Sequence, residues 1–440
     1  MGFGHISLLS KLWSNYIVPL GYYSESVKHA LIALGCSHRA FLDDWPDEHG
    51  LGTQQMYKEM ATRQYAKAIY CTSQDMNDLS PTTIRTSLVS CLVFICLEII
   101  QGRYDKAMQH LRSGSRIMRS LAEAATSTHT SAVLSPTQRC MAETVSNYYD
   151  QLCDVSDMFM AIGCDTAYLL EQGEVIPDLS FFFRGGHNSS KDSSEPFTSA
   201  DEARYALHLV DEGFGKFLGY SFRGSLPMPW TDFLNVPEDM SPIEEEGWPG
   251  EWVVARHRFD VWSARLAAYT KNLKSDPSTP QSELWEVRLL SFMQMDWSLI
   301  IKCLEAPTTQ HSHRQAFQDL LEDAESLVYA EDAELKHPVF TLAADVIPRM
   351  VFIAGYSGEL DLQQRAIALL YAMRRKEGMW DSREIASVLE AILAARECST
   401  WDKEYEKVSL PRLAKMLESL KLYEGNGTIP MATLVDQVAS

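Results

Sequence analysis

The sequence lacks the short motifs that identify several large classes of enzyme. Its 440 residues contain no CxxC pair, no HExxH, no GxSxG and no glycine-rich phosphate loop. The first two motifs supply common zinc ligands, and the last two mark serine hydrolases and nucleotide-binding proteins. The sequence therefore gives no support for a metal-dependent or nucleotide-dependent enzyme, and we expect no bound metal and no cofactor.

Basic runs and long apolar runs are also missing. The net charge is −20, and nucleic-acid affinity comes largely from Lys and Arg that neutralise phosphates. We therefore expect no direct binding to nucleic acid and, for the same reason, none to anionic membrane surfaces. The most apolar run, Leu88–Ile100, is interrupted by Ser90 and Glu98 and is too short to span a bilayer. These features predict an intracellular protein, nuclear or cytoplasmic.

The cysteines do not resemble a disulfide framework. There are nine, an odd number, and several lie inside apolar runs such as VSCLVFICLEII. This usage is typical of buried free thiols in a reducing compartment.

What is present is helical periodicity along nearly the whole chain. Apolar residues recur at steps of three and four, which is the spacing of one helix face. The sequence predicts helices over residues 26–41, 56–70, 84–101, 104–121, 139–160, 200–218, 252–273, 283–304, 314–329, 339–356, 360–373 and 382–395. No run of alternating β-branched residues competes with them, so the predicted fold class is all-α.

Polar segments divide this helical pattern. Residues 123–138, 184–196 and 236–251 are rich in small, polar, proline or acidic residues, which is typical of loops and linkers. We predict an N-terminal helical lobe over residues 1–180, a flexible linker over 181–200 and a C-terminal helical lobe over 201–440. Both lobes are expected to consist of antiparallel helices within one domain of regulatory type.

Two groups of histidines raise the question of a metal site. His29, Cys36 and His38 lie within ten residues, but a structural zinc site needs four ligands, usually in two close pairs. His311 and His313 form an HxH pair without a third ligand at a fixed spacing. We interpret the first group as part of a packed amphipathic helix and the second as loop histidines.

The most polar helix interior is NYYDQLCDVSDMF, over residues 147–159. Asp150, Asp154 and Asp157 share one face there, which predicts either a solvated acidic surface or the polar wall of a pocket between helices. If a cavity exists, we expect the helix 139–160 to line it. The candidate ligand-binding residues are His110, Tyr149 and Asp154, with Trp380 as an aromatic lid from the other lobe; no catalytic residue can be assigned.

Three separated stretches carry a family resemblance. SVKHALIALGCSHRAF (26–41) is followed by LVSCLVFICLEIIQGRYDKAMQHLRSGSRIMRSL (88–121) and, much later, by EGMWDSREIASVLEAI (377–392). Together they resemble the fungal-specific transcription factor domain, the all-helical regulatory region of fungal Zn2Cys6 regulators. The matched pattern is CLxFxxLExxxGxxxxAxxHLxxG with a late GxWDS, and the resemblance extends from about residue 15 to about residue 395. It implies that the histidines of the first stretch are scaffold.

The six-cysteine DNA-binding element of that family does not occur in these residues. The chain is thus expected to be a regulator that lost its DNA-binding element, a regulator whose sequence is cut short upstream, or a helical scaffold recruited for another task. The first hypothesis is a regulatory module, tied to secondary metabolism, that senses a small apolar metabolite or binds a protein partner; a homodimer is compatible with it. The alternative is a cofactor-free cyclase or isomerase, such as a Diels-Alderase, that folds a terpenoid or polyketide between its helices.

Overall fold

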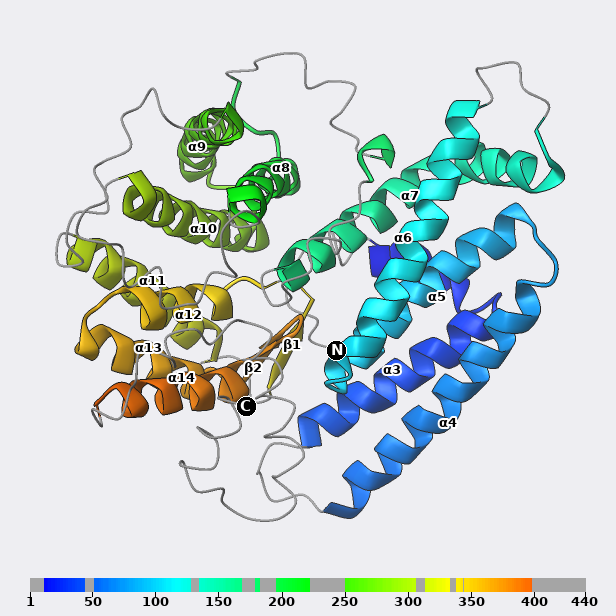
Figure 1. Ribbon diagram of the computed structural model, residues 1–440, viewed down its shortest axis with the longest axis horizontal. Coiled ribbons are helices and arrows are strands. Elements are labelled where there is room, and N and C mark those ends of the chain that lie inside the picture. The colour runs from blue at the N-terminus through cyan, green and yellow to red at the C-terminus, as the bar shows by residue number, and fades with distance from the viewer. Residues whose placement is uncertain are drawn as a thin grey trace. The chain divides into compact units, whose positions relative to one another are not determined.

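The helical fold is present in the computed structural model. It describes residues 12–43, 51–127, 134–167, 179–182, 195–221, 250–305, 313–332, 338–342 and 344–397. Over these ranges the all-α prediction is confirmed, because every element is helical except three short strands (Figure 1). The predicted lobe boundaries at residues 180 and 201 stay a prediction.

The chain forms two compact units. Unit 1 comprises residues 1–165, 174–192 and 337–343, and unit 2 comprises residues 166–173, 193–336 and 344–440.

Unit 1 consists mainly of five long helices. Its elements are η1 (Trp13–Ile17), α2 (Val18–Leu20), α3 (Glu25–Asp43), α4 (Leu51–Asp75), α5 (Pro81–Ile100), α6 (Tyr104–Ser127), most of α7 (Pro136–Ala167), η3 (Ser180–Phe182) and β1 (Val339–Thr341). Helices α3 and α4 pack along their length, and α5 packs against α3 and α6. The strand β1 returns from far along the chain, and Phe340 places its ring 6.3 Å from that of Phe41.

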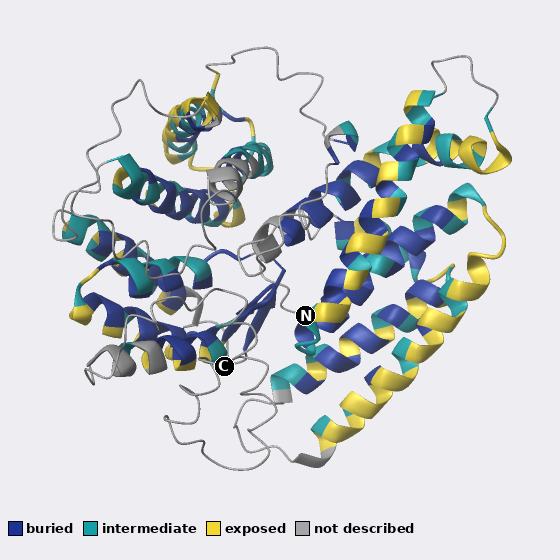
Figure 2. Cartoon of the chain, viewed as in Figure 1, coloured by how far each residue is buried: buried dark blue, intermediate teal, exposed yellow. Residues whose placement is uncertain are grey.

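Helix α5 is the core of unit 1. It begins where the Ser80 hydroxyl accepts a hydrogen bond from the Thr83 amide at 3.2 Å, with Pro81 in the first turn, where its missing N–H costs nothing. Among the described helices it alone is long and apolar enough to cross a membrane, and 83% of its most apolar window is buried inside the protein (Figure 2). Burial on nearly all sides accounts for this composition.

Helix α7 contains the predicted helix 139–160 but is not continuous. Tyr148 has φ −132° and ψ 22°, outside the helical region, so the helix kinks there. The Tyr148 ring is held beneath the guanidinium of Arg85, whose Cζ lies 4.4 Å from the ring centroid. The kink therefore coincides with the most polar stretch of the helix.

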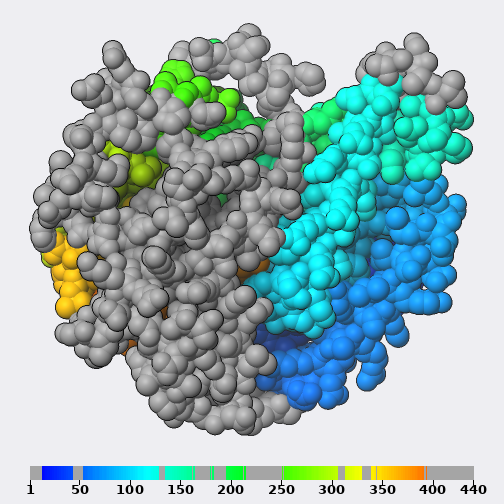
Figure 3. Space-filling model, viewed as in Figure 1, coloured from blue at the N-terminus to red at the C-terminus, as the bar shows by residue number. Residues whose placement is uncertain are grey.

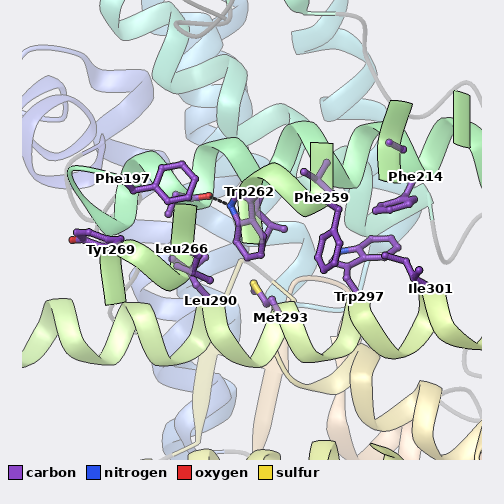
Figure 4. Packing of buried hydrophobic residues seen from close by; sticks show 14 of the residues in the cluster. Phe197, Phe214, Phe259, Trp262, Leu266, Tyr269, Leu290, Met293, Trp297 and Ile301 are labelled. Carbon is purple, nitrogen blue, oxygen red and sulfur yellow. Dashed lines mark hydrogen bonds between the residues drawn. The ribbon is translucent and has the colours of Figure 1, made fainter. Parts of the chain in front are cut away.

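Unit 2 contains the remaining elements. They are α8 (Ala200–Ser221), α9 (Gly250–Ser275), α10 (Gln281–Glu305), α11 (Arg314–Asp332), α12 (Ile347–Tyr356), α13 (Leu360–Ala372), β2 (Arg375–Glu377), β3 (Trp380–Asp381) and α14 (Ser382–Glu397). Helices α8, α9 and α10 enclose an aromatic core, in which the rings of Phe214 and Trp297 stack at 4.5 Å (Figure 4). Trp262 donates its indole N–H to the carbonyl of Ala203 at 2.8 Å, which satisfies the one polar atom of that side chain.

The late EGMWDS stretch forms a hairpin that ties two helices together. Gly378 has φ 53°, a conformation that favours glycine, and connects β2 to β3, where Glu377 pairs with Trp380. The Glu377 carboxylate accepts hydrogen bonds from the two amides that open α12, at 2.8 and 2.9 Å. The Asp381 carboxylate accepts hydrogen bonds from the amides of Arg383 and Glu384, in the first turn of α14, at 3.1 and 3.3 Å. The hairpin therefore caps two helices at once.

The predicted helix 339–356 is wrong before Ile347. Residues Val339–Thr341 form the strand β1, and α12 begins only at Ile347. Pro348 lies in the first turn of α12, the helical position that a proline tolerates best. The apolar run was continuous enough to resemble one helix, but the proline marks the true start.

Candidate functional site

The motif residue Glu98 lies at the end of α5 and is fully buried. Its carboxylate pairs with the guanidinium of Arg103, which follows the turn between α5 and α6. Gly102 in that turn has φ 71°, and the Arg103 amide donates to the Glu98 carbonyl at 2.8 Å. A buried carboxylate needs such a partner, because an unpaired charge in the core is strongly destabilising.

Two further side chains complete a polar cluster around Glu98. Tyr65 of α4 and His110 of α6 share a hydrogen bond, with 2.9 Å between the hydroxyl oxygen and Nε2. The His110 ring lies 5.2 Å from that of Phe94, and the Arg103 guanidinium lies 5.7 Å from the centroid of the Tyr65 ring. We refer to Tyr65, Glu98, Arg103 and His110 as the Glu98 cluster.

The surroundings of the Glu98 cluster keep its histidine and its tyrosine uncharged. Burial lowers the pKa of His110 below its ordinary value of 6.5, although the nearby Glu98 opposes this shift. Burial and the neighbouring Glu98 raise the pKa of Tyr65 well above its usual range. Near neutral pH both groups are therefore uncharged and offer a hydroxyl and an imidazole for hydrogen bonding. One oxygen of Glu98, Oε1, accepts no hydrogen bond from any described residue.

The neighbouring thiols do not add a nucleophile. Burial raises the pKa of Cys91 and of Cys96 to about 12, so both are protonated at neutral pH. A thiol acts as a nucleophile only as the thiolate. This agrees with the interpretation of the cysteines as buried free thiols.

The structure places the four predicted site residues in different surroundings. His110 belongs to the Glu98 cluster. Tyr149 lies next to the kink of α7, and its hydroxyl donates to the Phe181 carbonyl at 3.3 Å. Asp154 is half-buried on α7, between the exposed Asp150 and the buried Asp157, so the acidic face is not uniformly solvated. Trp380 is buried in unit 2, and its indole N–H has no hydrogen-bond partner among the described residues. Their role in ligand binding stays a prediction.

Tyr65 and Arg103 were not predicted as site residues. Tyr65 lies 45 positions before His110, and nothing local indicates that α4 and α6 meet. A signal for Arg103 does exist, since it follows Glu98 by five positions across a glycine turn at the end of an apolar run. An acidic residue in such a run needs a partner, and Arg103 is the first basic residue after it.

The histidines and cysteine of the first stretch have packing roles in α3. His29 places Nδ1 2.6 Å from Oε1 of Gln64 on α4, Cys36 is buried, and the His38 ring lies 6.3 Å from that of Phe41. Over the described ranges no three His, Cys, Asp or Glu side chains are grouped as metal ligands. His313 directly precedes α11, whereas His311 lies outside the described residues.

Unit 2 contains a second buried polar network. Arg204 of α8 donates to Glu286 of α10 at 2.9 Å and to Asp345 at 3.3 Å. One turn along α8, burial and the Arg204 charge lower the pKa of His208 to about 4. Burial also raises the pKa of Asp211 to about 6, although this carboxylate accepts the Trp297 indole N–H at 2.7 Å. These charges connect α8, α10 and the segment before α12.

Comparison with known proteins shows a similarity in the N-terminal part. Residues 3–146 match the fungal specific transcription factor domain, a stretch that includes the whole Glu98 cluster. The resemblance seen in the sequence motif is thereby confirmed over this stretch. The late hairpin lies beyond it.

A curated relative extends the similarity. The chain is 20% identical to the aspercryptin biosynthesis cluster-specific transcription regulator atnN of Emericella nidulans over 313 residues. This match covers 69% of the chain. The match spans 45% of the relative, less than half of its length. No solved structure matches the chain significantly. Both matches are to a domain or a protein named for transcription regulation.

Proposed function

We propose that the chain is a regulatory region that controls transcription of a fungal biosynthetic gene cluster in the nucleus in response to a small apolar metabolite. The observation that carries the proposal is the family match over residues 3–146, whose motif residues build the Glu98 cluster. The relative is named as a regulator specific to one biosynthesis cluster, which supports the link to secondary metabolism.

The Glu98 cluster is the proposed contact for the polar end of the metabolite. It combines neutral hydrogen-bonding groups with apolar walls, here the Phe94 ring and the buried face of α5. Ligand sites in proteins commonly have this composition. The buried Oε1 of Glu98 is an acceptor that no described residue uses, and a ligand hydroxyl would satisfy it.

The described helices are not proposed to read DNA. The net charge of −20 disfavours contact with phosphates. Purified protein is therefore expected to give no sequence-specific gel shift at about 0.15 M salt.

The test replaces His110 in the fungus. His110→Phe keeps an aromatic ring but removes the hydrogen bond to Tyr65, and transcripts of the neighbouring biosynthetic genes should fall at an unchanged protein level. Gln109→Ala is the matched control, because Gln109 is exposed on the same helix. Unchanged transcripts in His110→Phe would contradict the proposal. A new product formed from extracts by purified protein without cofactor would favour the cyclase or isomerase instead.

A further inference from the structure

The outer side of the α3–α4 pair carries exposed apolar side chains. Ile32 on α3 is 39% exposed, and Met56 and Met60 on α4 are 49% and 39% exposed. Figure 2 shows exposed residues along much of α4, and Figure 3 shows its side chains on the surface of the protein. Large apolar groups gathered on one surface are typical of an interaction site.

The register of the helix pair brings these residues to one level. His29 bonds Gln64, and Gln54 donates to the Ala40 carbonyl, so α3 and α4 run antiparallel. In this register Ile32 lies at about the same height as Met60. The exposed apolar residues of the two helices therefore form one patch.

Gly35 interrupts this surface in the middle of α3. It is exposed, and a Cβ added there would meet no atom within 4 Å. Glycine inside a helix is less stable than alanine, so internal packing does not explain its presence. A missing side chain at an exposed position instead lets a second backbone approach closely.

Basic residues border the apolar patch. Met56, Met60, Arg63, Lys67 and Tyr70 follow one another at steps of three and four, so they share the outer face of α4. Neither Arg63 nor Lys67 has an ion-pair partner among the described residues, although the protein as a whole carries a charge of −20. The α3–α4 face is defined by Ile32, Gly35, Met56, Met60, Arg63, Lys67 and Tyr70.

We infer that the α3–α4 face binds an acidic amphipathic helix of a partner protein. The apolar side of that helix would cover Ile32, Met56 and Met60, its backbone would approach Gly35, and its carboxylates would pair with Arg63 and Lys67. Recognition of a helix by an apolar surface with a charged border is a recurring mode of protein binding. This inference goes beyond the proposed function and does not depend on the Glu98 cluster.

Charge argues against a second copy as the occupant. Two α3–α4 faces brought together would place Arg63 and Lys67 of one copy close to the same residues of the other. Like charges at an interface disfavour association. The carboxylates of an acidic helix would instead face the cationic Arg63 and Lys67.

The test measures binding of a synthetic helix to the full chain by fluorescence anisotropy. The probe is a labelled peptide with leucines at i, i+3, i+4 and i+7 and glutamates elsewhere, compared with the same peptide carrying lysines. The acidic peptide should bind, and the double variant Arg63→Glu with Lys67→Glu should raise its Kd at least about tenfold. Arg116→Glu with Arg119→Glu is the matched control, since both residues are exposed on α6, and its Kd should equal that of the wild type.

The apolar contribution is tested in the same assay. Met56→Ser with Met60→Ser should weaken binding of the acidic peptide, whereas Val253→Ser with Val254→Ser, at exposed positions of α9, should not. All replaced residues are exposed, so melting temperatures should stay close to that of the wild type.

Four outcomes would overturn the inference. The acidic peptide does not bind, or it binds no better than the basic one, or the α3–α4 variants leave its Kd unchanged. The fourth outcome is that the α3–α4 face binds something other than an acidic helix. A second copy would appear in sedimentation as a dimer that Met60→Ser abolishes. Nucleic acid would appear as binding of mixed-sequence DNA that the Arg63→Glu, Lys67→Glu variant loses.

Discussion

Two glycines of the family-like stretches provide a matched pair for testing the packing of unit 1. Gly114 ends the motif on α6 and faces Phe159 of α7. A Cβ built on Gly114 would lie 2.4 Å from Cζ and 2.9 Å from Cε2 of that ring, and the ring is fully buried. Gly35 on α3 meets nothing within 4 Å. A methyl group added by substitution with alanine would therefore clash with a buried ring at Gly114 but would meet open space at Gly35.

The expected effects follow from two contributions. Alanine is favoured over glycine in a helix by about 0.8–1 kcal/mol, and this gain applies at both positions. At Gly114 the contact with Phe159 adds an overpacking cost of about 1–3 kcal/mol, and the 2.4 Å approach places it near the upper end. We expect Gly114→Ala to destabilise unit 1 by about 1–2 kcal/mol and Gly35→Ala to stabilise it by about 0.5–1 kcal/mol.

Hydrogen–deuterium exchange by mass spectrometry is the suitable assay, because a chain of two units need not unfold in one step. Peptides from α6 and α7 should lose protection in Gly114→Ala and gain it in Gly35→Ala. Peptides from α10, in unit 2, serve as the internal reference. A Gly114→Ala protein as protected as the wild type would refute the close packing of Gly114 against Phe159.

Further substitutions test other parts of the structure. Leu97→Ala, at a buried site of α5, should lower the free energy of unfolding by about 2–5 kcal/mol in a urea titration; an unchanged midpoint would contradict its burial. Glu377→Ala should cost about 3 kcal/mol and reduce exchange protection at the start of α12, while Glu377→Gln, which keeps an acceptor, should cost less. His208 has a folded-state pKa of about 4, below its unfolded value, so its stabilising contribution is present above about pH 6.5 and is lost as the pH falls to 4. Because 32% of the His208 side chain is exposed, solvent screens part of this effect. The stability of wild type relative to His208→Gln should therefore fall by about 1–2 kcal/mol over that range, and a difference that does not change with pH would count against the partial burial of His208.

The helices could be predicted because their signal is local. Helix α5 follows from a run of apolar residues between Ser80, which caps it, and the Gly102 turn. The kink at Tyr148 has no comparable signal, because neither a proline nor a glycine occupies the site. The start of α12 was misplaced although Pro348 marks it locally; Glu377, the group that caps it, comes 30 residues later in the sequence.

The candidate site was predictable only in part, for the same physical reason. His110 was predicted as a candidate ligand-binding residue, but its partner Tyr65 lies on another helix, and their contact is non-local. Tyr149 was also predicted as a ligand-binding residue, and its hydroxyl donates to the Phe181 carbonyl. Hydrogen bonds between distant side chains depend on how the helices pack, and helical periodicity does not determine this.

The motif residues have structural roles that constrain how function can be tested. Glu98 and Arg103 close the α5–α6 turn, Gly102 supplies its positive φ, and Gly114 gives Phe159 room. Replacing any of them is expected to lower stability, so a loss of activity in such a variant does not by itself identify a binding residue. Exposed residues on the α3–α4 face, such as Arg63, do not contribute to the packing of the core in this way. Variants there separate the function of the domain from its folding, and they therefore give the more decisive test.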